Sequence, residues 1–383
     1  MNTTKINVLT SLRFFASSTV VVGHSLPFFG LSETLLRYIP AYNGVTFFFV
    51  LSGFILTFNY RTLETPERVW RFAVARFARL WPLHFTTFVL AIILLPDLRG
   101  VLFTPVGMAK AALNLTFMQS FVPFLGFQFS YNSVSWSISD EFYFYACFVG
   151  LLSFIGRPFS RLTWIALAGP IVMVSICIAL ALPSYDPNPL AASGATLIYI
   201  HPVARLLDFG IGMVAAALFL QFGPALKVAP RRLATLLEAV VILLIIGTAA
   251  LTYSSFARVW PSAPPAILLW LERSGSSPIY ALGIFILAFE RGRVSRLLRH
   301  PGLVLLGEIS FATYLAHQII LRWLAAHPAA FADVPLPAAY GLFLAAVLSG
   351  SWILWRFIER PARTAIYQRL AVGPARSIAL EGT

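Results

Sequence analysis

Long apolar segments alternate with short polar and basic segments along almost the whole of this chain. An apolar stretch of about 18 residues or more is typical of a helix that crosses a lipid bilayer. On this pattern we predict an all-α integral membrane protein with about ten transmembrane helices. The predicted helices cover residues 8–27, 41–60, 81–97, 135–155, 162–182, 201–221, 235–252, 278–290, 303–324 and 338–358.

Residues 98–134 fit this pattern less well. They are moderately apolar, but they include Lys110 and several proline and glycine residues. A re-entrant or interfacial segment would fit, because irregular backbone is tolerated in a membrane where protein buries it or where it lines a cavity. Two additional helices would also leave the flanking helices on the same sides of the membrane. The sequence does not decide between these interpretations.

The composition agrees with a membrane protein. Of the 383 residues, 58% are hydrophobic and only 11% are charged, and the mean hydropathy is +0.80. In a soluble domain about 25% of the residues are charged. The net charge of +13 does not indicate nucleic-acid binding, because the basic residues form short clusters between the apolar segments. Cys147 and Cys177 both lie in apolar segments, where we expect them to be small buried side chains.

The basic clusters also predict the orientation of the chain. If the ten helices alternate in direction, twenty of the 28 lysine and arginine residues fall on one side of the membrane. Lysine and arginine are enriched in cytoplasmic loops, so we predict that both termini lie in the cytoplasm. Residues 1–365 are expected to form one transmembrane domain, and residues 366–383 a short cytoplasmic tail.

The first apolar segment contains Arg13 and His24, which are eleven residues apart. In an α-helix this spacing is a rotation of roughly 1100°, so both side chains lie on one face, about 16 Å apart along the axis. Ionisable groups in membrane helices usually face a wet cavity or the protein interior and serve function. One interpretation makes His24 a general base near the outer face, with Arg13 deeper in the same cavity. In the alternative, Arg13 reaches the cytoplasmic interface and His24 only caps the other end of the helix.

Arg76 and Arg79 precede the predicted third helix and lie three residues apart, so they would share a helical face. Such a pair is typical of a basic surface that contacts the membrane. It is equally suited to bind phosphate groups, which arginine holds through two parallel hydrogen bonds. The spacing alone leaves both roles open.

A serine-rich stretch at residues 132–141 ends in two adjacent carboxylates, Asp140 and Glu141. These acids could serve only as partners of the positive end of the helix dipole. Glu141 is followed by apolar and aromatic residues, which places it at the membrane boundary, where a carboxylate can pair with a histidine. We expect Glu141 to contact His24, because both lie near the outer ends of their predicted helices.

Two further stretches are rich in small or polar residues. Residues 44–54 are predicted to form an apolar helix whose small residues allow close packing against other helices. On the predicted ninth helix a polar stripe consists of Glu308, Ser310, Tyr314 and His317. Such a stripe normally faces other helices, and its contact with a substrate stays open. Sequence motifs for a Gly-x-Ser-x-Gly nucleophile, a His-Glu-x-x-His zinc site or a phosphate-binding loop are not found.

Taken together, these stretches resemble the acyltransferase-3 family of integral-membrane O-acyltransferases. The resemblance extends over residues 5–363 and follows the family's order of motifs: Arg13 with His24, 44–54, 76–82, 135–141, 306–317 and 359–361. Two positions depart from the family's pattern. Asp140 stands where an apolar residue is usual, so it could compete with Glu141 for His24, and Phe311 replaces a common tyrosine.

The resemblance implies transfer of an acyl group, most often acetyl, from acyl-CoA to a hydroxyl group of a carbohydrate. Acceptors in the family include exopolysaccharide, the O-antigen of lipopolysaccharide, peptidoglycan and macrolide antibiotics. By motif, His24, Glu141 and Arg13 would be catalytic, and Arg76 and Arg79 would bind acyl-CoA, with no metal. The partners would be membrane lipid and a carbohydrate or lipid-linked glycan acceptor, at the inner membrane of a bacterium.

Two rival interpretations remain. A transporter or flippase of a glycan or lipid-linked substrate would also use ionisable residues near the middle of the membrane, although no inverted repeat is visible. An enzyme that carries the acyl group on His24 or Ser52 would transfer it in two steps. Direct attack by the acceptor hydroxyl needs no such carrier, because a thioester is already activated.

Overall fold

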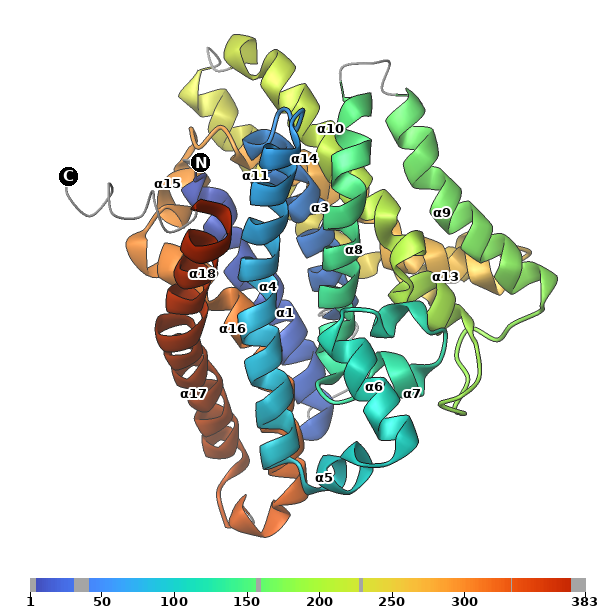
Figure 1. The fold of residues 1–383 in the computed structure, drawn as a ribbon. Helices are drawn as coiled ribbons and strands as arrows, with labels where there is room; N and C mark the ends of the chain where they lie inside the picture. Colours follow the sequence, from blue (N-terminus) through green and yellow to red (C-terminus); the bar gives the residue numbers. More distant parts are fainter. Residues whose placement is uncertain (1–4, 31–40, 156–159, 227–229, 332, 373–383) are drawn as a thin grey trace.

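The computed structural model describes residues 5–30, 41–155, 160–226, 230–331 and 333–372. All regular secondary structure in these residues is helical (Figure 1). Long helices run through the bundle at different inclinations, and several short helices gather at one end of it. The predicted all-α architecture is therefore confirmed.

Each of the ten predicted helices has a counterpart in the structure. In chain order they are α1 (Asn7–Phe28), α3 (Ala41–Asn59), α4 (Pro66–Leu94), α8 (Trp136–Leu151), α9 (Ser160–Ala179), α10 (Pro202–Leu226), α11 (Arg231–Gly247), α14 (Ser277–Leu287), α16 (Pro301–Ala326) and α17 (Leu336–Leu354). After α17 the helical path continues through a π-helical segment and a short α-helix. These are η7 (Trp355–Glu359), α18 (Arg360–Tyr367) and the terminal turn η8 (Gln368–Val372).

Seven helical stretches of the described chain are long and apolar enough to cross a membrane. Six of them belong to α3, α4, α9, α10, α11 and α16, and the seventh extends from α17 beyond α18. α1 has 22 residues, but its polar residues lower its hydropathy, and α8 and α14 have only 16 and 11 residues. The structure thus supports a multi-pass membrane protein, whereas the predicted count of ten spans is not confirmed.

Residues 98–134 form short helices. The segment contains most of α5 (Pro96–Leu102), followed by α6 (Pro105–Leu115), η1 (Gln119–Phe121), α7 (Leu125–Gln128) and η2 (Ser133–Ser135). The longest of them has 11 residues. It covers only about 17 Å, whereas the hydrocarbon core of a bilayer is about 30 Å thick. Of the two interpretations that the sequence left open, the structure favours a segment at one end of the bundle over two additional spanning helices (Figure 1).

α4 begins fifteen residues earlier than the predicted third helix. It starts at Pro66, where the side chain of Thr65 accepts a hydrogen bond from the backbone N–H of Arg68. The first turns of α4 are rich in charged residues, so hydropathy alone does not detect them, although Thr-Pro-Glu is a typical helix start. Arg76 and Arg79 therefore lie within α4, as their expected common helical face requires, and not ahead of its first residue.

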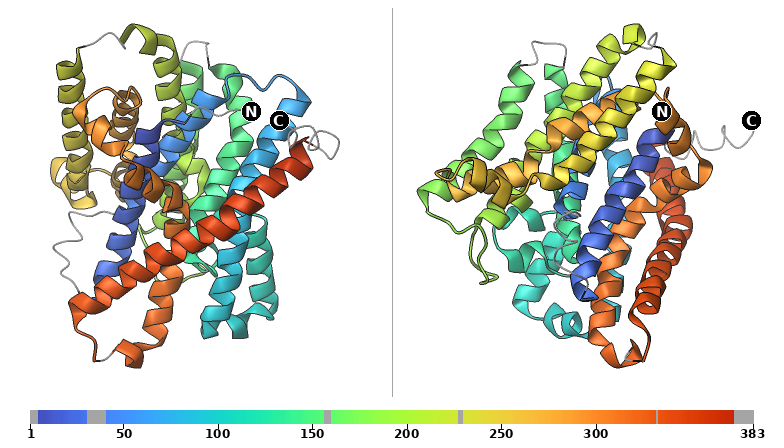
Figure 2. Two further views of the ribbon diagram at one scale, coloured as in Figure 1. Left: turned by 90° about the vertical axis from the view of Figure 1, so that its left-hand side faces the viewer. Right: turned by 180° about the vertical axis from the view of Figure 1, so that it is seen from behind.

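α1 is held between its neighbours by close backbone contacts. Gly307 of α16 lies against the backbone of Thr10, and Gly44 of α3 lies against the backbone of Ala16. Neither glycine has room for a Cβ atom, so these are positions where only glycine permits the approach. Figure 2 shows α1 alongside α16. This packing fixes the rotation of α1 about its axis, and with it the directions of its two ionisable side chains.

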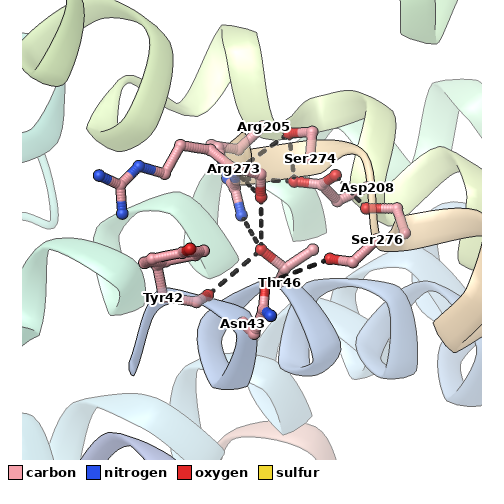
Figure 3. A network of polar contacts seen from close by, with 9 residues as sticks. Tyr42, Asn43, Thr46, Arg205, Asp208, Arg273, Ser274 and Ser276 are labelled. Carbon is pink, nitrogen blue, oxygen red and sulfur yellow. Dashed lines mark hydrogen bonds and ion pairs between the residues drawn. The ribbon is translucent and has the colours of Figure 1, made fainter. Parts of the chain in front are cut away.

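A buried polar network joins α3, α10 and α13 (Pro265–Ser274), as Figure 3 shows. The fully buried guanidinium of Arg205 donates to Thr46 Oγ1 at 2.6 Å and to Ser274 Oγ at 3.0 Å. It also forms an ion pair with Asp208 at 3.0 Å. Opposite charges and hydrogen bonds together allow two ionised groups to remain in the core of the bundle. The network holds the ends of three helices together.

We predict that Gly307→Ala destabilises the protein, because its Cβ atom would overlap with the Thr10 carbonyl oxygen and separate α1 from α16. Overpacking typically costs about 1–3 kcal/mol, so the thermal unfolding midpoint in detergent should fall. Gly350→Ala on α17 is the control, because its Cβ atom would meet open space and should leave the midpoint unchanged or raised. Equal midpoints for the two variants would show that the close contact of α1 with α16 is dispensable.

Candidate active site

A cavity of about 440 Å³ lies between α1, α3, α4, α8, α16 and the segment from η7 to α18. Six basic and three acidic residues line it: Lys5, Arg13, Arg76, Arg79, Arg360 and Arg363, with Glu141, Glu308 and Glu359. Lys5, Arg360 and Arg363 are exposed, so the cavity reaches the protein surface. The excess of positive charge suits an anionic ligand.

The arginines of α1 and α4 differ in the partners that they have. Arg13 makes no hydrogen bond or ion pair with any other residue that the structure describes, although it lines the cavity. Arg76 donates to the hydroxyl of Tyr60 at 3.2 Å, and its guanidinium lies 5.5–5.9 Å from the centres of three aromatic rings. Arg79 forms an ion pair with Glu359. Arg13 and Arg76 are therefore better placed than Arg79 to bind an added anion.

Glu141 lies in the wall of the same cavity, on α8. One carboxylate oxygen accepts a hydrogen bond from Ser52 Oγ of α3 at 3.2 Å. The same oxygen accepts another from the hydroxyl of Tyr145, one turn further along α8. Glu141 is also close enough to attract the positive charge of Arg13. These contacts direct the carboxylate toward α3 and the cavity.

His24 lies toward the other end of α1 and is not among the residues that line this cavity. Its Nδ1 atom is 3.0 Å from Nε2 of His317 on α16, and the two rings are inclined by only 15°. The side chain of His24 is exposed, whereas that of His317 is fully buried. Tyr314 borders both places, because it lines the cavity and its ring centre lies 6.0 Å from that of His317.

The expected contact between Glu141 and His24 is therefore not present. Glu141 shares the cavity with Arg13, and on α1 His24 is about 16 Å away from Arg13. A carboxylate at the level of Arg13 is too far from His24 for a hydrogen bond. Asp140, the other candidate partner, is fully buried and makes no hydrogen bond to His24.

Two partners were not predicted from the sequence. His317 is the hydrogen-bond partner of His24, and Glu359 is the ion-pair partner of Arg79. His317 did belong to the polar stripe of α16, but its pairing with a residue 293 positions away leaves no local pattern. In the part of the chain that the structure describes, no group of three or more histidine, cysteine or acidic residues could hold a metal ion.

Comparison with known proteins identifies the class. Residues 6–356 match the acyltransferase-3 family, described as an acyltransferase domain. The acyltransferase MdmB of Streptomyces mycarofaciens is 29% identical over 335 aligned residues, which cover 82% of this chain and 79% of that protein. Nose resistant to fluoxetine protein 6 of Caenorhabditis elegans is 22% identical over 384 aligned residues, which cover 84% of this chain and 46% of that protein. No solved structure matches the chain significantly.

The chain therefore belongs to the acyltransferase-3 family, as its motifs indicated. It is a multi-pass membrane O-acyltransferase. A transporter or flippase without acyl-transfer chemistry has no support from these relatives. The matched region contains the pair of His24 with His317 and most of the cavity, and it ends just before Glu359 and the exposed arginines of α18.

We predict that Glu359→Gln destabilises the protein strongly, because it leaves the charge of Arg79 without its partner. The two side chains are only 4% and 13% exposed, and breaking a buried pair costs about 3–5 kcal/mol. The control is Glu308→Gln, whose side chain and that of its partner Lys5 are 34% and 46% exposed. An exposed pair contributes about 0–1 kcal/mol. Thermal unfolding in detergent checks the prediction, and equal effects of the two variants would contradict it.

Proposed function

We propose that this protein transfers an acyl group from acyl-CoA to a hydroxyl group of a cell-surface or exported carbohydrate. We expect the acyl group to be acetyl. His24 would act as the general base. The observation that carries the proposal is the arrangement along α1, with a basic cavity near its start and an exposed histidine toward its end. Such a helix offers separate places for an anionic donor and for a hydroxyl acceptor.

The proposed orientation places both termini and the mouth of the cavity in the cytoplasm of a bacterium, with the protein in the inner membrane. The start of α1 and α18 lie at the same end of the bundle (Figure 1), and exposed basic residues surround the cavity there. The enrichment of lysine and arginine on the cytoplasmic side supports this choice. The predicted count of ten crossings stays part of the proposal, although the 11 residues of α14 are too few to cross the hydrocarbon core on their own.

The donor would bind in the cavity. Acyl-CoA carries several phosphate groups, and arginine binds phosphate through two parallel charge-assisted hydrogen bonds. Arg76 and the exposed arginines of α18 would hold the phosphates, while Arg79, through its pair with Glu359, would keep α4 and η7 in place around them. Arg13, balanced by Glu141, would contact the donor further along α1. This assignment keeps Arg76 and Arg79 in the donor site but gives them different tasks.

The transfer itself would take place beside His24. As the acceptor oxygen attacks the thioester carbonyl carbon, its proton moves to the imidazole. A new C–O bond forms, the C–S bond breaks, and the CoA thiolate leaves and takes up the proton from His24. A positioned general base contributes about 10²–10⁴-fold to a rate. The thioester supplies the remaining activation, so the scheme needs no acyl-enzyme on Ser52 or His24.

We predict that His24→Ala lowers acyl transfer by about 10²–10⁴-fold, which is the contribution of a general base. The variant should remain folded, because His24 is exposed. The measurement is the incorporation of label from radiolabelled acetyl-CoA into glycans of membranes that contain the protein, against membranes without it. His327→Ala, an exposed histidine at the end of α16, is the control and should retain activity. A normally expressed His24→Ala protein with full activity would exclude His24 as the base.

We predict that Arg76→Ala raises the KM for acetyl-CoA by about tenfold to 100-fold, because a hydrogen bond to a charged group contributes about 1.5–3 kcal/mol. The value of kcat should change much less, since Arg76 is far along the bundle from His24. Steady-state titration with acetyl-CoA measures both constants. Arg258→Ala removes an exposed arginine of α12 (Tyr253–Val259), outside the cavity, and should leave KM unchanged. A normal KM in the Arg76→Ala protein would argue against a donor site in the cavity.

A further inference from the structure

His317 contacts the proposed base directly, and the proposed function gives it no role. The Nδ1 atom of His24 is 3.0 Å from Nε2 of His317. On the other side of the same ring, Nδ1 of His317 is 3.2 Å from the carbonyl oxygen of Thr313, one turn earlier in α16. A chain of two hydrogen bonds therefore leads from the exposed His24 to the backbone of a buried helix.

The positions of the hydrogens in this chain follow from the chemistry of its acceptor. A carbonyl oxygen can only accept, so Nδ1 of His317 carries a hydrogen and donates to Thr313. A neutral imidazole has one N–H group, so Nε2 of His317 has a free lone pair and accepts from Nδ1–H of His24. In neutral His24 the Nε2 atom is then the unprotonated nitrogen. It is the nitrogen that points away from His317.

A doubly protonated His317 would reverse this assignment, but its surroundings disfavour a charge. The side chain is fully buried, and no carboxylate among the described residues hydrogen-bonds to it. Among the residues that the structure describes, the ionisable side chains nearest the pair are two tyrosines. The ring centre of Tyr314 on α16 lies 6.0 Å from that of His317, and the hydroxyl of Tyr340 on α17 lies 3.2 Å from Oγ of Ser25, the residue after His24. Phenols are neutral at physiological pH. An unpaired buried charge is costly, so His317 is neutral.

We propose that His317 is a positioning residue that holds His24 in its Nδ1–H tautomer, so that Nε2 of His24 accepts the proton of the acceptor hydroxyl. This inference rests on the proposed function for the role of His24, although the tautomer itself does not. In the transfer, the O–H bond of the acceptor breaks and an N–H bond forms at Nε2, which later releases the proton to the CoA thiolate. While His24 is positively charged, its hydrogen bond to His317 becomes charge-assisted and stronger.

Two substitutions of His317 separate positioning from packing. His317→Leu fills the space but removes the acceptor for Nδ1–H of His24. His317→Gln keeps an acceptor oxygen and should restore most of the activity. For His317→Leu we expect kcat with radiolabelled acetyl-CoA to fall by about 100-fold, within the range that a general base contributes. The KM for acetyl-CoA should stay unchanged, because the cavity that would bind it is lined by other residues.

The matched control is His84 on α4, which is also buried. Its Nε2 atom lies 2.9 Å from the carbonyl oxygen of Asn114, and His84 neither lines the cavity nor takes part in the hydrogen bond between His24 and His317. His84→Leu therefore reports the cost of removing a buried histidine from this fold. We expect His84→Leu to lower the amount of folded protein and to leave the kcat of each folded molecule unchanged. A fall in kcat for both variants alike would mean that His317 acts only through stability.

¹⁵N NMR of histidine-labelled protein in detergent reads the tautomer without any assay of activity. The His24 signals are assigned by their loss in His24→Ala. We expect a protonated Nδ1 and an unprotonated Nε2 in the natural protein and in His317→Gln, and a loss of this preference in His317→Leu. A protonated Nε2 in the natural protein overturns the proposal, as does an unchanged kcat in a folded His317→Leu protein. Full activity of His24→Ala would instead defeat the proposed function, and the NMR result would still test the tautomer.

Discussion

The structure depends on the high cost of keeping ionised groups inside a membrane protein without partners or water. Arg205 and Asp208 are fully buried, and they compensate each other in a closed network of hydroxyl groups. The cavity near the start of α1 is different, because six basic residues there face only three acidic ones. Pairing cannot neutralise that excess, so water or an anionic ligand must do so. This contrast separates a cluster that holds helices together from one that is suited to bind a charged donor.

The packing of α1 connects this constraint to chemistry. Gly44 and Gly307 bring α1 into backbone contact with two neighbouring helices, which fixes its rotation. Because the helix cannot turn, Arg13 faces the cavity while His24, about three turns further along, meets His317. A helix that was free to rotate would lose both contacts at once. The small residues of α3 and α16 are therefore as necessary to the site as the ionisable residues that they place.

The sequence was sufficient for features that follow from local spacing and hydropathy. These include the helical membrane fold and the common face of Arg13 and His24. It failed where charged residues extend a helix, as at the start of α4. It located α14 correctly, but the predicted crossing by that helix is not confirmed, because α14 has only 11 residues. It also failed for contacts between helices. Glu141 points to α3 and not to His24, and His317 is the partner of His24 instead. These contacts could not be predicted, because the relative rotation of two packed helices leaves no signal in the sequence of either helix alone.

On the proposed mechanism the acyl group must travel from the cavity to His24, because Arg13 and His24 are about 16 Å apart on one helix. Tyr314 stands between the two places, with its hydroxyl 2.8 Å from Ser137 Oγ and its ring 6.0 Å from that of His317. Because Tyr314 is buried and hydrogen-bonded, we do not expect the bulky nucleotide to pass it. The phosphate-bearing part of CoA would thus stay with the arginines while its thin pantetheine arm reaches the histidines. On this mechanism α1 contributes to both chemical environments, with Arg13 in the cavity and His24 beside His317.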